Sequence, residues 1–274
     1  MNSIFVANKP LFISSNHYLN RLKRKYKTKK MGFSGTLDPF ATGCLIIATG
    51  QYPKLFPYLK KTPKNYTATI WLGAVSSSLD IENIVSINEA EKLHEDKIKE
   101  VLDNLVGKQK YLPPKYSAKK IDGQRAYKLA REEIDFELKY VTSTIYDVTF
   151  INYNHPFISL NITVSEGSYI RSLAQIVLEK LESVGTLSYL KREYEGKFLF
   201  DNENFLDIMK FLDLPHNVYL GEKELFFNGK PLDITQFQTK KQGKYIIEFE
   251  DFFSIIEIES SGHISYILNR VEKC

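Results

Sequence analysis

Short runs of apolar residues, and runs in which apolar and polar residues alternate, predict a chain rich in strands. Residues 66–72 show the alternation, with Thr67, Thr69 and Trp71 on one side and Tyr66 beginning the opposite, apolar side. Runs of similar character occur at residues 4–7, 44–49, 140–153, 157–164 and 187–200. We expect a strand at each of these segments.

Apolar positions at three- and four-residue spacing predict four helices. The first follows Ser14 or Ser15, either of which offers an N-cap, and the longest apolar stripe covers residues 169–184, with Gly185 as a C-terminal stop. The remaining helices are expected from Asn88 to Gly107 and over residues 124–131. Residues 27–43 show neither pattern and are expected to form a long loop.

The pattern changes after about residue 213. Pro215 is followed by three short strand-like runs, at residues 245–249, 253–258 and 263–268. We therefore expect two domains, a large one over residues 1–213 and a small β domain over residues 214–274.

Composition narrows the class of protein. Of 274 residues, 43% are hydrophobic, which allows a sizeable core. Two cysteines, Cys44 and Cys274, are too few and too far apart in sequence for a disulfide framework or a zinc site. The N-terminus lacks a basic leader, and no run approaches the roughly 18 apolar residues of a membrane span. We expect a cytoplasmic protein without a metal site or a membrane partner.

The net charge of +4 hides a strong asymmetry. Residues 1–131 contain 23 Lys and Arg against 10 Asp and Glu, whereas residues 132–274 contain 14 against 23. The densest basic run spans residues 21–30, and a second cluster lies within residues 115–131. Clustered cations favour a polyanionic partner because they release condensed counterions from phosphates. Each run alone fits a solvated helix face equally well, and the asymmetry names no particular polyanion.

The segment 32–43 places three glycines and a proline around one carboxylate, Asp38. Its residues could form a simple turn, because Asp followed by Pro is a common turn former. It lacks the Gly-Lys-Ser/Thr ending of a phosphate-binding loop and the glycine spacing of a dinucleotide fold, and its carboxylate would repel a phosphate. A rigid loop of this kind can aim a carboxylate.

The run Gly35-Thr36-Leu37-Asp38-Pro39 resembles the signature motif of the TruB and dyskerin-like pseudouridine synthases. Four further segments resemble family motifs in the family's order, and together they span about residues 4–200. They are Asn8-Lys9-Pro10 with Ser14-Ser15, Lys64-Asn65-Tyr66 leading to Leu72-Gly73, the stretch 113–131, and residues 165–173. The resemblance implies an α+β fold, with a central mixed, largely antiparallel sheet flanked by helices and a small PUA-like C-terminal domain.

The resemblance also implies the reaction and its principal residues. A pseudouridine synthase isomerises a uridine, with Asp38 as catalytic carboxylate, Arg171 as its orienting cation and Tyr66 stacking on the base and helping at C5. A nearby guanidinium favours the charged carboxylate, so we expect the pKa of Asp38 to be lowered by about 1–3 units. No cofactor or metal is expected. Whether Asp38 adds to C1′ or takes a 2′ proton stays open.

The sequence of residues 113–123 resembles that of the free-standing bacterial enzyme. This resemblance implies that the substrate is the T-arm of tRNA and that no guide RNA is needed. An insertion around residues 108–135 would grip the T-arm, and the protein is expected to be monomeric. Basic and aromatic residues expected to contact RNA are Lys9, Lys23, Arg24, Phe33, Lys64, Lys119, Lys120, Arg125 and Arg131.

The chain departs from the family pattern at several positions. Phe33 stands where the bacterial family usually has His, Ser168 replaces a usual Thr, and residues 74–80 read differently from the typical sequence. Phe33 can still stack but cannot donate a hydrogen bond. Two alternatives remain: a non-catalytic protein that binds or folds RNA, and a synthase acting on another uridine or another RNA.

Overall fold

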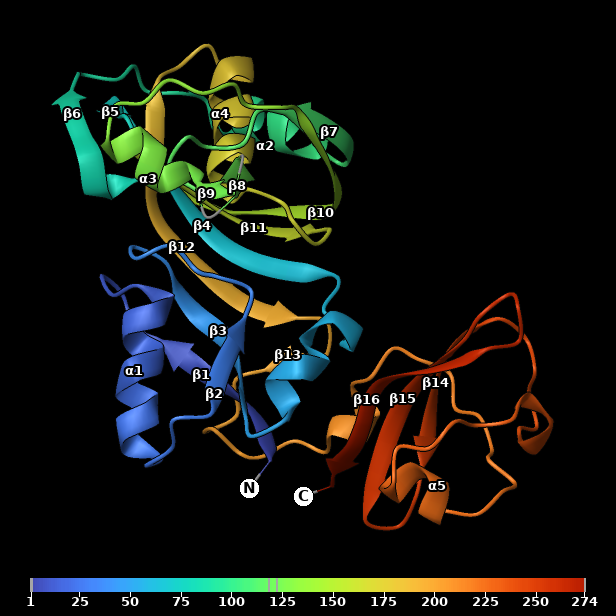
Figure 1. Cartoon of the computed structure of the whole chain (residues 1–274). Helices are drawn as coiled ribbons and strands as arrows, with labels where there is room; N and C mark the ends of the chain where they lie inside the picture. The colour runs from blue at the N-terminus through green and yellow to red at the C-terminus, as the bar shows by residue number, and fades with distance from the viewer. Residues whose placement is uncertain (1, 118, 122, 274) are drawn as a thin grey trace.

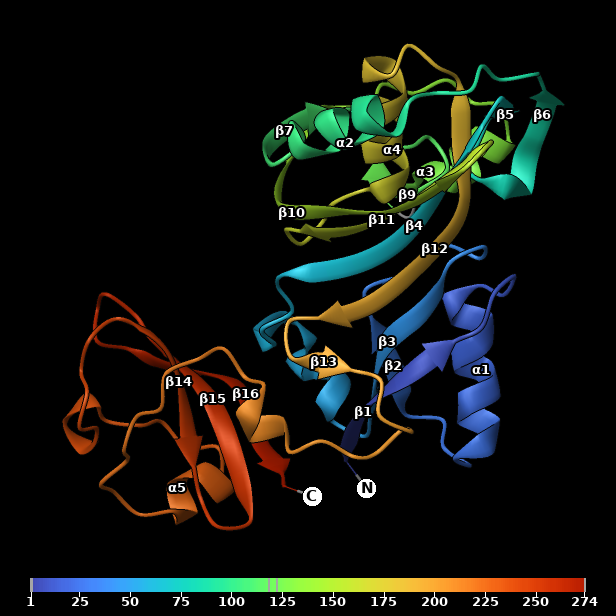
Figure 2. The same cartoon turned by 180° about the vertical axis from the view of Figure 1, so that it is seen from behind.

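One large sheet dominates residues 3–199 in this computed structural model, which describes residues 2–117, 119–121 and 123–273 (Figures 1 and 2). Within these residues it has nine strands, whose main order is β1-β3-β12-β4-β11-β10-β7, with β2 paired to β3 and β13 to β12. The strands are β1 (Ser3–Lys9), β2 (Met31–Ser34), β3 (Thr42–Thr49), β4 (Lys64–Leu72), β7 (Gly107–Tyr111), β10 (Val141–Asn154), β11 (Phe157–Val164), β12 (Gly185–Glu195) and β13 (Phe198–Leu199). Among the described strands, β12 and β3 run parallel and every other pair of this sheet is antiparallel.

The alternation predicted for residues 66–72 is confirmed in β4, at the centre of the sheet. Tyr66 and every second residue after it are buried, whereas Thr67, Thr69 and Trp71 are partly exposed. Each of the other predicted segments contains a strand, and β11 has the predicted ends, but residues 187–200 contain two strands, β12 and β13, rather than one. Period-two patterning succeeds for this strand because one face of β4 is buried and the other is partly exposed.

Helices cover the buried face of the sheet. The described helices are α1 (Ser15–Lys25), α2 (Glu95–Asp103), α3 (Ala126–Arg131), α4 (Ile170–Lys180) and α5 (Glu224–Phe227). Helices α2 and α4 lie together over β4, β10 and β11 and share one apolar core with them, while α1 packs beside β1 and β2 (Figure 1). Ser14 is the N-cap of α1, as predicted, since its side chain accepts from the backbone N–H of His17. Among the described residues no helix combines the length and the apolar character that crossing a membrane requires.

Several predicted boundaries are wrong. The expected loop over residues 27–43 contains β2, which at four residues is too short to show a pattern. Helix α2 begins at Glu95 rather than near Asn88. Helix α4 ends at Lys180, and Gly185 is the first residue of β12 rather than a helix stop. A Cβ at Gly185 would lie 2.6 Å from the carbonyl oxygen of Trp71, so glycine permits the close approach of β12 to β4.

Two small hairpins and several short 3-10 helices were not predicted. The hairpins pair β5 (Ala74–Ser76) with β6 (Ile84–Ile87) and β8 (Lys120–Ile121) with β9 (Gln124–Arg125). The 3-10 helices lie at Tyr52–Tyr58, Ile81–Asn83, Ile208–Lys210 and Ile234–Gln236. Three residues of the sequence analysis lie outside the described residues. They are Cys274 and, in the stretch 113–131, Ala118 and Asp122.

A second sheet forms near the C-terminus from β14 (Gly243–Glu248), β15 (Phe252–Ile258) and β16 (Ile264–Glu272), which correspond to the three predicted runs. It has a core of its own and also shares an apolar cluster with β1 and β3. The side-chain amide of Asn2 donates to the carbonyl oxygen of Glu272 at 2.9 Å, and both chain ends lie close together in Figure 1. The boundary at residues 213 and 214 stays a prediction.

Candidate active site

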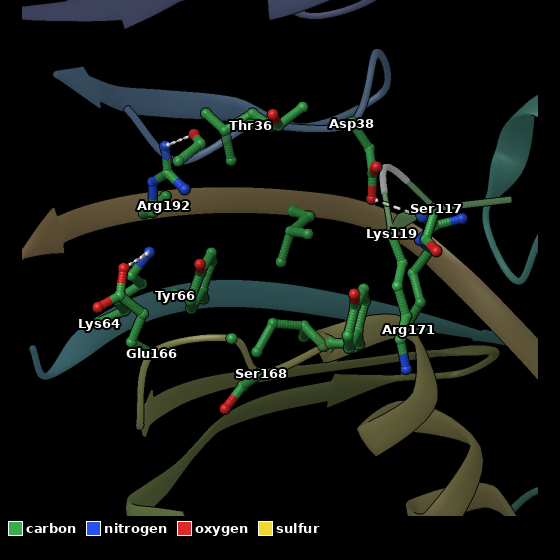
Figure 3. Close-up of a pocket in the computed structure, with 16 residues that line it drawn as sticks. Thr36, Asp38, Lys64, Tyr66, Ser117, Lys119, Glu166, Ser168, Arg171 and Arg192 are labelled. Atoms are coloured by element: carbon green, nitrogen blue, oxygen red, sulfur yellow. Dashed lines mark hydrogen bonds and ion pairs between the residues drawn. The ribbon is translucent and has the colours of Figure 1, made fainter. Parts of the chain in front are cut away.

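A cavity of about 330 Å³ opens between the loop after β2, strands β4 and β12, and the start of α4 (Figure 3). The three residues expected to be catalytic all line it. Asp38 points in from the loop, Tyr66 comes from β4, and Arg171 comes from the first turn of α4. Residues far apart in sequence therefore meet in one site.

The loop that carries Asp38 is anchored just before that residue. Arg192 Nη2 donates to the carbonyl oxygen of Gly35 at 2.7 Å. The Ser15 hydroxyl donates to the carbonyl oxygen of Leu37 at 2.8 Å and accepts from the backbone N–H of Leu37 at 2.9 Å. These bonds satisfy buried backbone groups of the loop, and they fix the direction of the Asp38 side chain.

Arg171 contacts Asp38 directly, as the sequence indicated. Its Nη2 lies 2.9 Å from Asp38 Oδ2, and its side chain is only 4% exposed. The other terminal nitrogen, Nη1, lies 3.1 Å from Asp80 Oδ2 and donates to the carbonyl oxygen of Ser78 at 2.7 Å. A further bond from Nη2 reaches the carbonyl oxygen of Tyr116 at 2.8 Å. The guanidinium is thus held by four oxygens and keeps one orientation.

The pKa of Asp38 is raised above its ordinary value, opposite to the predicted lowering. Removal of water from the carboxyl is the largest cause, and the nearby charge of Asp80 adds to it. Arg171 opposes the shift, but its charge is shared between Asp38 and Asp80. The prediction failed because it considered the nearby cation but neither the burial of the carboxyl nor the second carboxylate. Part of the Asp38 side chain, 33%, remains exposed to the cavity.

Tyr66 lies on the buried face of the sheet, with its side chain 6% exposed. Its partner across the β4–β12 pair is Arg192, and Leu190 from β12 lines the same cavity. An aromatic ring and an aliphatic side chain at such positions provide an apolar surface on which a planar base can lie. Figure 3 shows the Tyr66 ring rising from β4 toward the loop that carries Asp38.

A buried group of charges closes the end of the cavity near Tyr66. Glu195 is fully buried and lies 2.8 Å from Arg192 Nη2 and 3.0 Å from Lys64 Nζ. Burial alone would lower the pKa of Arg192, but opposing causes, of which the charge of Glu195 is the largest, outweigh it and raise that pKa. A Cβ at Gly35, where φ is +71°, would lie 2.7 Å from Glu195 Oε1. The buried charges around Glu195 therefore pack directly against the loop that carries Asp38.

The structure gives Lys9 a different position from the one expected. Lys9 is fully buried, and its ammonium donates to the carbonyl oxygens of Ile13 at 2.6 Å, Pro10 at 2.9 Å and Pro39 at 3.2 Å. Burial lowers its pKa to about 8, and Asp38 opposes the shift. Lys9 thus holds the loop behind Asp38 and presents no charge at the surface, which corrects its expected role as an RNA contact.

The other expected RNA contacts fall into four places. Lys64 and Lys119 line the cavity with Tyr66, although Lys64 is buried and paired. Phe33, Arg125 and Arg131 line a second cavity, of about 540 Å³, on the other side of Asp38. Lys23 and Arg24 belong to a separate basic depression at the end of α1, and Lys120 is exposed on β8. The last three occupy surface positions open to a polyanion.

Several residues of the site were missed in the sequence. Asp80 lies in the stretch 74–80, whose departure from the family pattern was noticed without recognising its carboxylate. Arg192 and Glu195 belong to a strand whose alternation does not distinguish a buried charge from an exposed one. Only the pairing of β12 with β3 and β4 brings them to the loop.

Comparison of the sequence with known families gives one match, which covers residues 23–170. It is to the TruB family pseudouridylate synthase N-terminal domain. Among curated proteins, tRNA pseudouridine synthase B of Sulfurovum sp. (strain NBC37-1) is 54% identical over 273 residues, covering 100% of this chain and 98% of that protein. The protein of the same name from Campylobacter concisus (strain 13826) is 53% identical over 274 residues, with all of both chains covered.

Comparison with solved structures gives more distant matches. A chain in the crystal structure of a Cbf5-Nop10-Gar1 complex superimposes with a TM-score of 0.67 at 17% identity, covering 99% of this chain and 84% of that chain. A chain of the archaeal box H/ACA sRNP Nop10-Cbf5 complex gives 0.64, also at 17% identity. At this level of identity the match concerns the fold, and it confirms the expected fold class.

Proposed function

Because this chain belongs to the TruB family of tRNA pseudouridine synthases, we propose that it isomerises the uridine of the T-arm loop of tRNA, with Asp38 as its catalytic carboxylate. The observation that carries the proposal is the 2.9 Å ion pair between Asp38 and Arg171 at a cavity lined by Tyr66. A fixed cation beside the carboxylate and an apolar wall beyond it suit a reaction on a flipped nucleoside.

The reaction conserves all atoms of the nucleoside. The N1–C1′ bond breaks, the uracil turns, a C5–C1′ bond forms, the C5 proton leaves and N1 gains a proton. Asp38 begins this sequence either by adding to C1′ or by taking a proton from C2′, and both routes require its ionised form. The raised pKa of Asp38 makes its carboxylate a stronger base, which suits the route in which it takes a proton from C2′.

Each remaining group has a part in this scheme. Arg171 orients the carboxylate and stabilises its charge, since both of its terminal nitrogens are fixed. Tyr66 stacks on the detached uracil and helps at C5. The cavity is large enough for one nucleoside, and the target base must leave its stack to enter it, which costs a few kcal/mol. The exposed basic side chains of the N-terminal half offset that cost through phosphate contacts.

The test is release of tritium from a tRNA transcript labelled at uracil C5. We expect about one equivalent per tRNA, lost both with Asp38→Asn protein and with a transcript that lacks the T-loop uridine. Release that persists with the altered transcript would move the target to another uridine. Tight binding without release would favour a protein that only binds or folds RNA.

We also propose that the enzyme works as a monomer on tRNA in the cytoplasm, without a guide RNA. The tRNA substrate supports the location, and the full-length identity to relatives named tRNA pseudouridine synthase B supports the substrate. A T-arm stem-loop should therefore suffice as substrate, and a requirement for a second RNA would contradict this part of the proposal.

A further inference from the structure

The side chain of Ser117 lies where the two cavities around Asp38 meet. Ser117 lines both cavities, as do Asp38 and Arg171. It is 3% exposed, and within the described part of the chain its hydroxyl has no hydrogen-bond partner. Buried hydroxyls are normally paired, so an unpaired one at a cavity wall indicates a group that is satisfied by a ligand.

The backbone around Ser117 is held by Arg171 and by the backbone of Tyr127. Arg171 donates to the carbonyl oxygen of Tyr116, the preceding residue, at 2.8 Å. On the other side, the backbone N–H of Tyr127 donates to the carbonyl oxygen of Ser117 at 3.0 Å. The same guanidinium that orients Asp38 therefore also holds the backbone next to Ser117, and Figure 3 shows Ser117 and Arg171 on the Asp38 side of the cavity.

One neighbouring side chain could compete for this hydroxyl. The Tyr169 phenol is near enough that Ser117 partly opposes the rise that burial causes in the pKa of Tyr169. The pair nevertheless does not meet hydrogen-bond geometry, and Ser117 Oγ stays unpaired. The hydroxyl is thus free to turn toward a ligand at the boundary of the cavities.

We propose that the Ser117 hydroxyl binds the 2′-hydroxyl of the target uridine and makes the site specific for ribose. This inference rests on the proposed function, in which Asp38 acts at C1′ or C2′. If so, the ribose lies beside Asp38, at the boundary of the cavities, while the base lies against Tyr66. The Arg171 guanidinium is already bonded to four protein oxygens, so a ribose hydroxyl there needs another partner. Ser117 provides it, and a 2′-hydroxyl is the group that distinguishes RNA from DNA at a single nucleotide.

The experiment compares the binding of two T-arm stem-loops that differ only in the target nucleotide, uridine or 2′-deoxyuridine. Both are titrated against Asp38→Asn protein, which removes turnover, with Ser117 intact or changed to Ala. With Ser117 we expect the ribose form to bind about 3- to 10-fold more tightly, the range of one neutral hydrogen bond. With Ser117→Ala that preference should fall to less than about twofold, while affinity for the deoxy form stays unchanged.

The controls separate this role from a structural one. Removing an unpaired hydroxyl should leave the free energy of unfolding unchanged or raised, and a 2′-deoxy substitution in the stem should show no dependence on Ser117. An equal preference for ribose in both proteins, or equal losses for both RNAs with reduced stability, would overturn the inference. Tritium release by the unmodified protein, measured in parallel, tests the proposed function separately. Its absence would overturn both proposals.

Discussion

The Asp80 carboxylate lies 3.1 Å from Nη1 of Arg171, on the same guanidinium that contacts Asp38 through Nη2. Asp80 is 2% exposed and is itself held by the Ser78 hydroxyl at 2.6 Å and the backbone N–H of Glu82 at 3.0 Å. Arg171 is therefore divided between the buried carboxylate of Asp80 and the carboxylate that we propose to be catalytic. This arrangement fixes the cation firmly while limiting how far it lowers the pKa of Asp38.

Asp80→Asn should lower kcat by about 10- to 100-fold, because an amide nitrogen cannot accept from Arg171 and the guanidinium loses one of its fixed partners. The same change removes a charge that raises the pKa of Asp38. We therefore expect the acidic limb of the pH–rate profile to move to lower pH while the plateau falls. Single-turnover tritium release across a pH series measures both effects.

Asp103→Asn is a matched control for Asp80→Asn, since Asp103 is an exposed acid at the end of α2. It should change neither the plateau nor the acidic limb. A lower plateau in Asp80→Asn without any movement of the acidic limb would contradict the electrostatic coupling between Asp80 and Asp38.

Asp38→Asn should increase the free energy of unfolding at neutral pH while it removes turnover. The pKa of Asp38 is raised in the folded protein, so the native state binds this proton more tightly than the unfolded chain does. The contribution of the Asp38 carboxyl to stability therefore falls as the pH rises above about 3.9, the pKa of an unfolded Asp. Asn carries no charge and escapes that loss. Urea unfolding of both proteins should show a gain for Asp38→Asn at about pH 7 that vanishes near pH 3. A lower stability of the variant at neutral pH would show that the ion pair outweighs desolvation.

Lys9→Met should destabilise the protein by about 1–3 kcal/mol, because the carbonyl oxygens of Pro10, Ile13 and Pro39 lose their donor. The pKa of Lys9 is about 8 in the folded protein, below its value in the unfolded chain. Between about pH 8 and pH 10.4 the unfolded chain holds more protons, so the Lys9 contribution to stability rises with pH. The stability difference between the unmodified protein and Lys9→Met should widen over this range in guanidinium unfolding. A difference that narrows would place the Lys9 ammonium outside the buried site.

Charge reversal at Lys23 and Arg24 should weaken tRNA binding and reduce its dependence on salt. Both residues line the basic depression at the end of α1, and each phosphate that is no longer neutralised should lower the slope of log K against log salt by about 0.9 for a duplex. Affinity measured over a salt series checks the slope. The same reversal at Lys240 and Lys241, an exposed basic pair in the C-terminal region, is the control. An unchanged slope in Lys23→Glu/Arg24→Glu would remove α1 from the RNA-binding surface.

Local pattern and motif together indicated much of the molecule. The strand over residues 66–72 follows from side-chain alternation, and α4 follows from its apolar stripe. Arg171 lies outside that apolar stripe. The structure places its side chain against Asp38, as the resemblance of residues 165–173 to a family motif implied. These predictions succeeded because a one-sided burial pattern and a contiguous motif both depend only on residues that are close together in sequence.

The charges that surround Asp38 could not be predicted in this way. Asp80 approaches Arg171 across 91 positions of sequence, and Glu195 meets Gly35 only because β12 runs beside β3. A period-two pattern predicts which face a residue occupies but says nothing of which charges share that face. The error about the pKa of Asp38 and the misplacement of Lys9 have this same origin, since both depend on burial by distant segments.

Strand β3 ties the two sheets into one structure. Cys44, Ile46 and Ala48 point into the apolar cluster shared with the C-terminal sheet, whereas Leu45 and Ile47 point into the cluster beneath α1. Loss of the C-terminal sheet would remove part of the apolar packing on one face of the strand that leads away from the Asp38 loop. The protein should therefore melt in a single cooperative transition, and bound tRNA should protect amide hydrogens of β15 from exchange as well as those of β3, whether or not the RNA touches the C-terminal sheet.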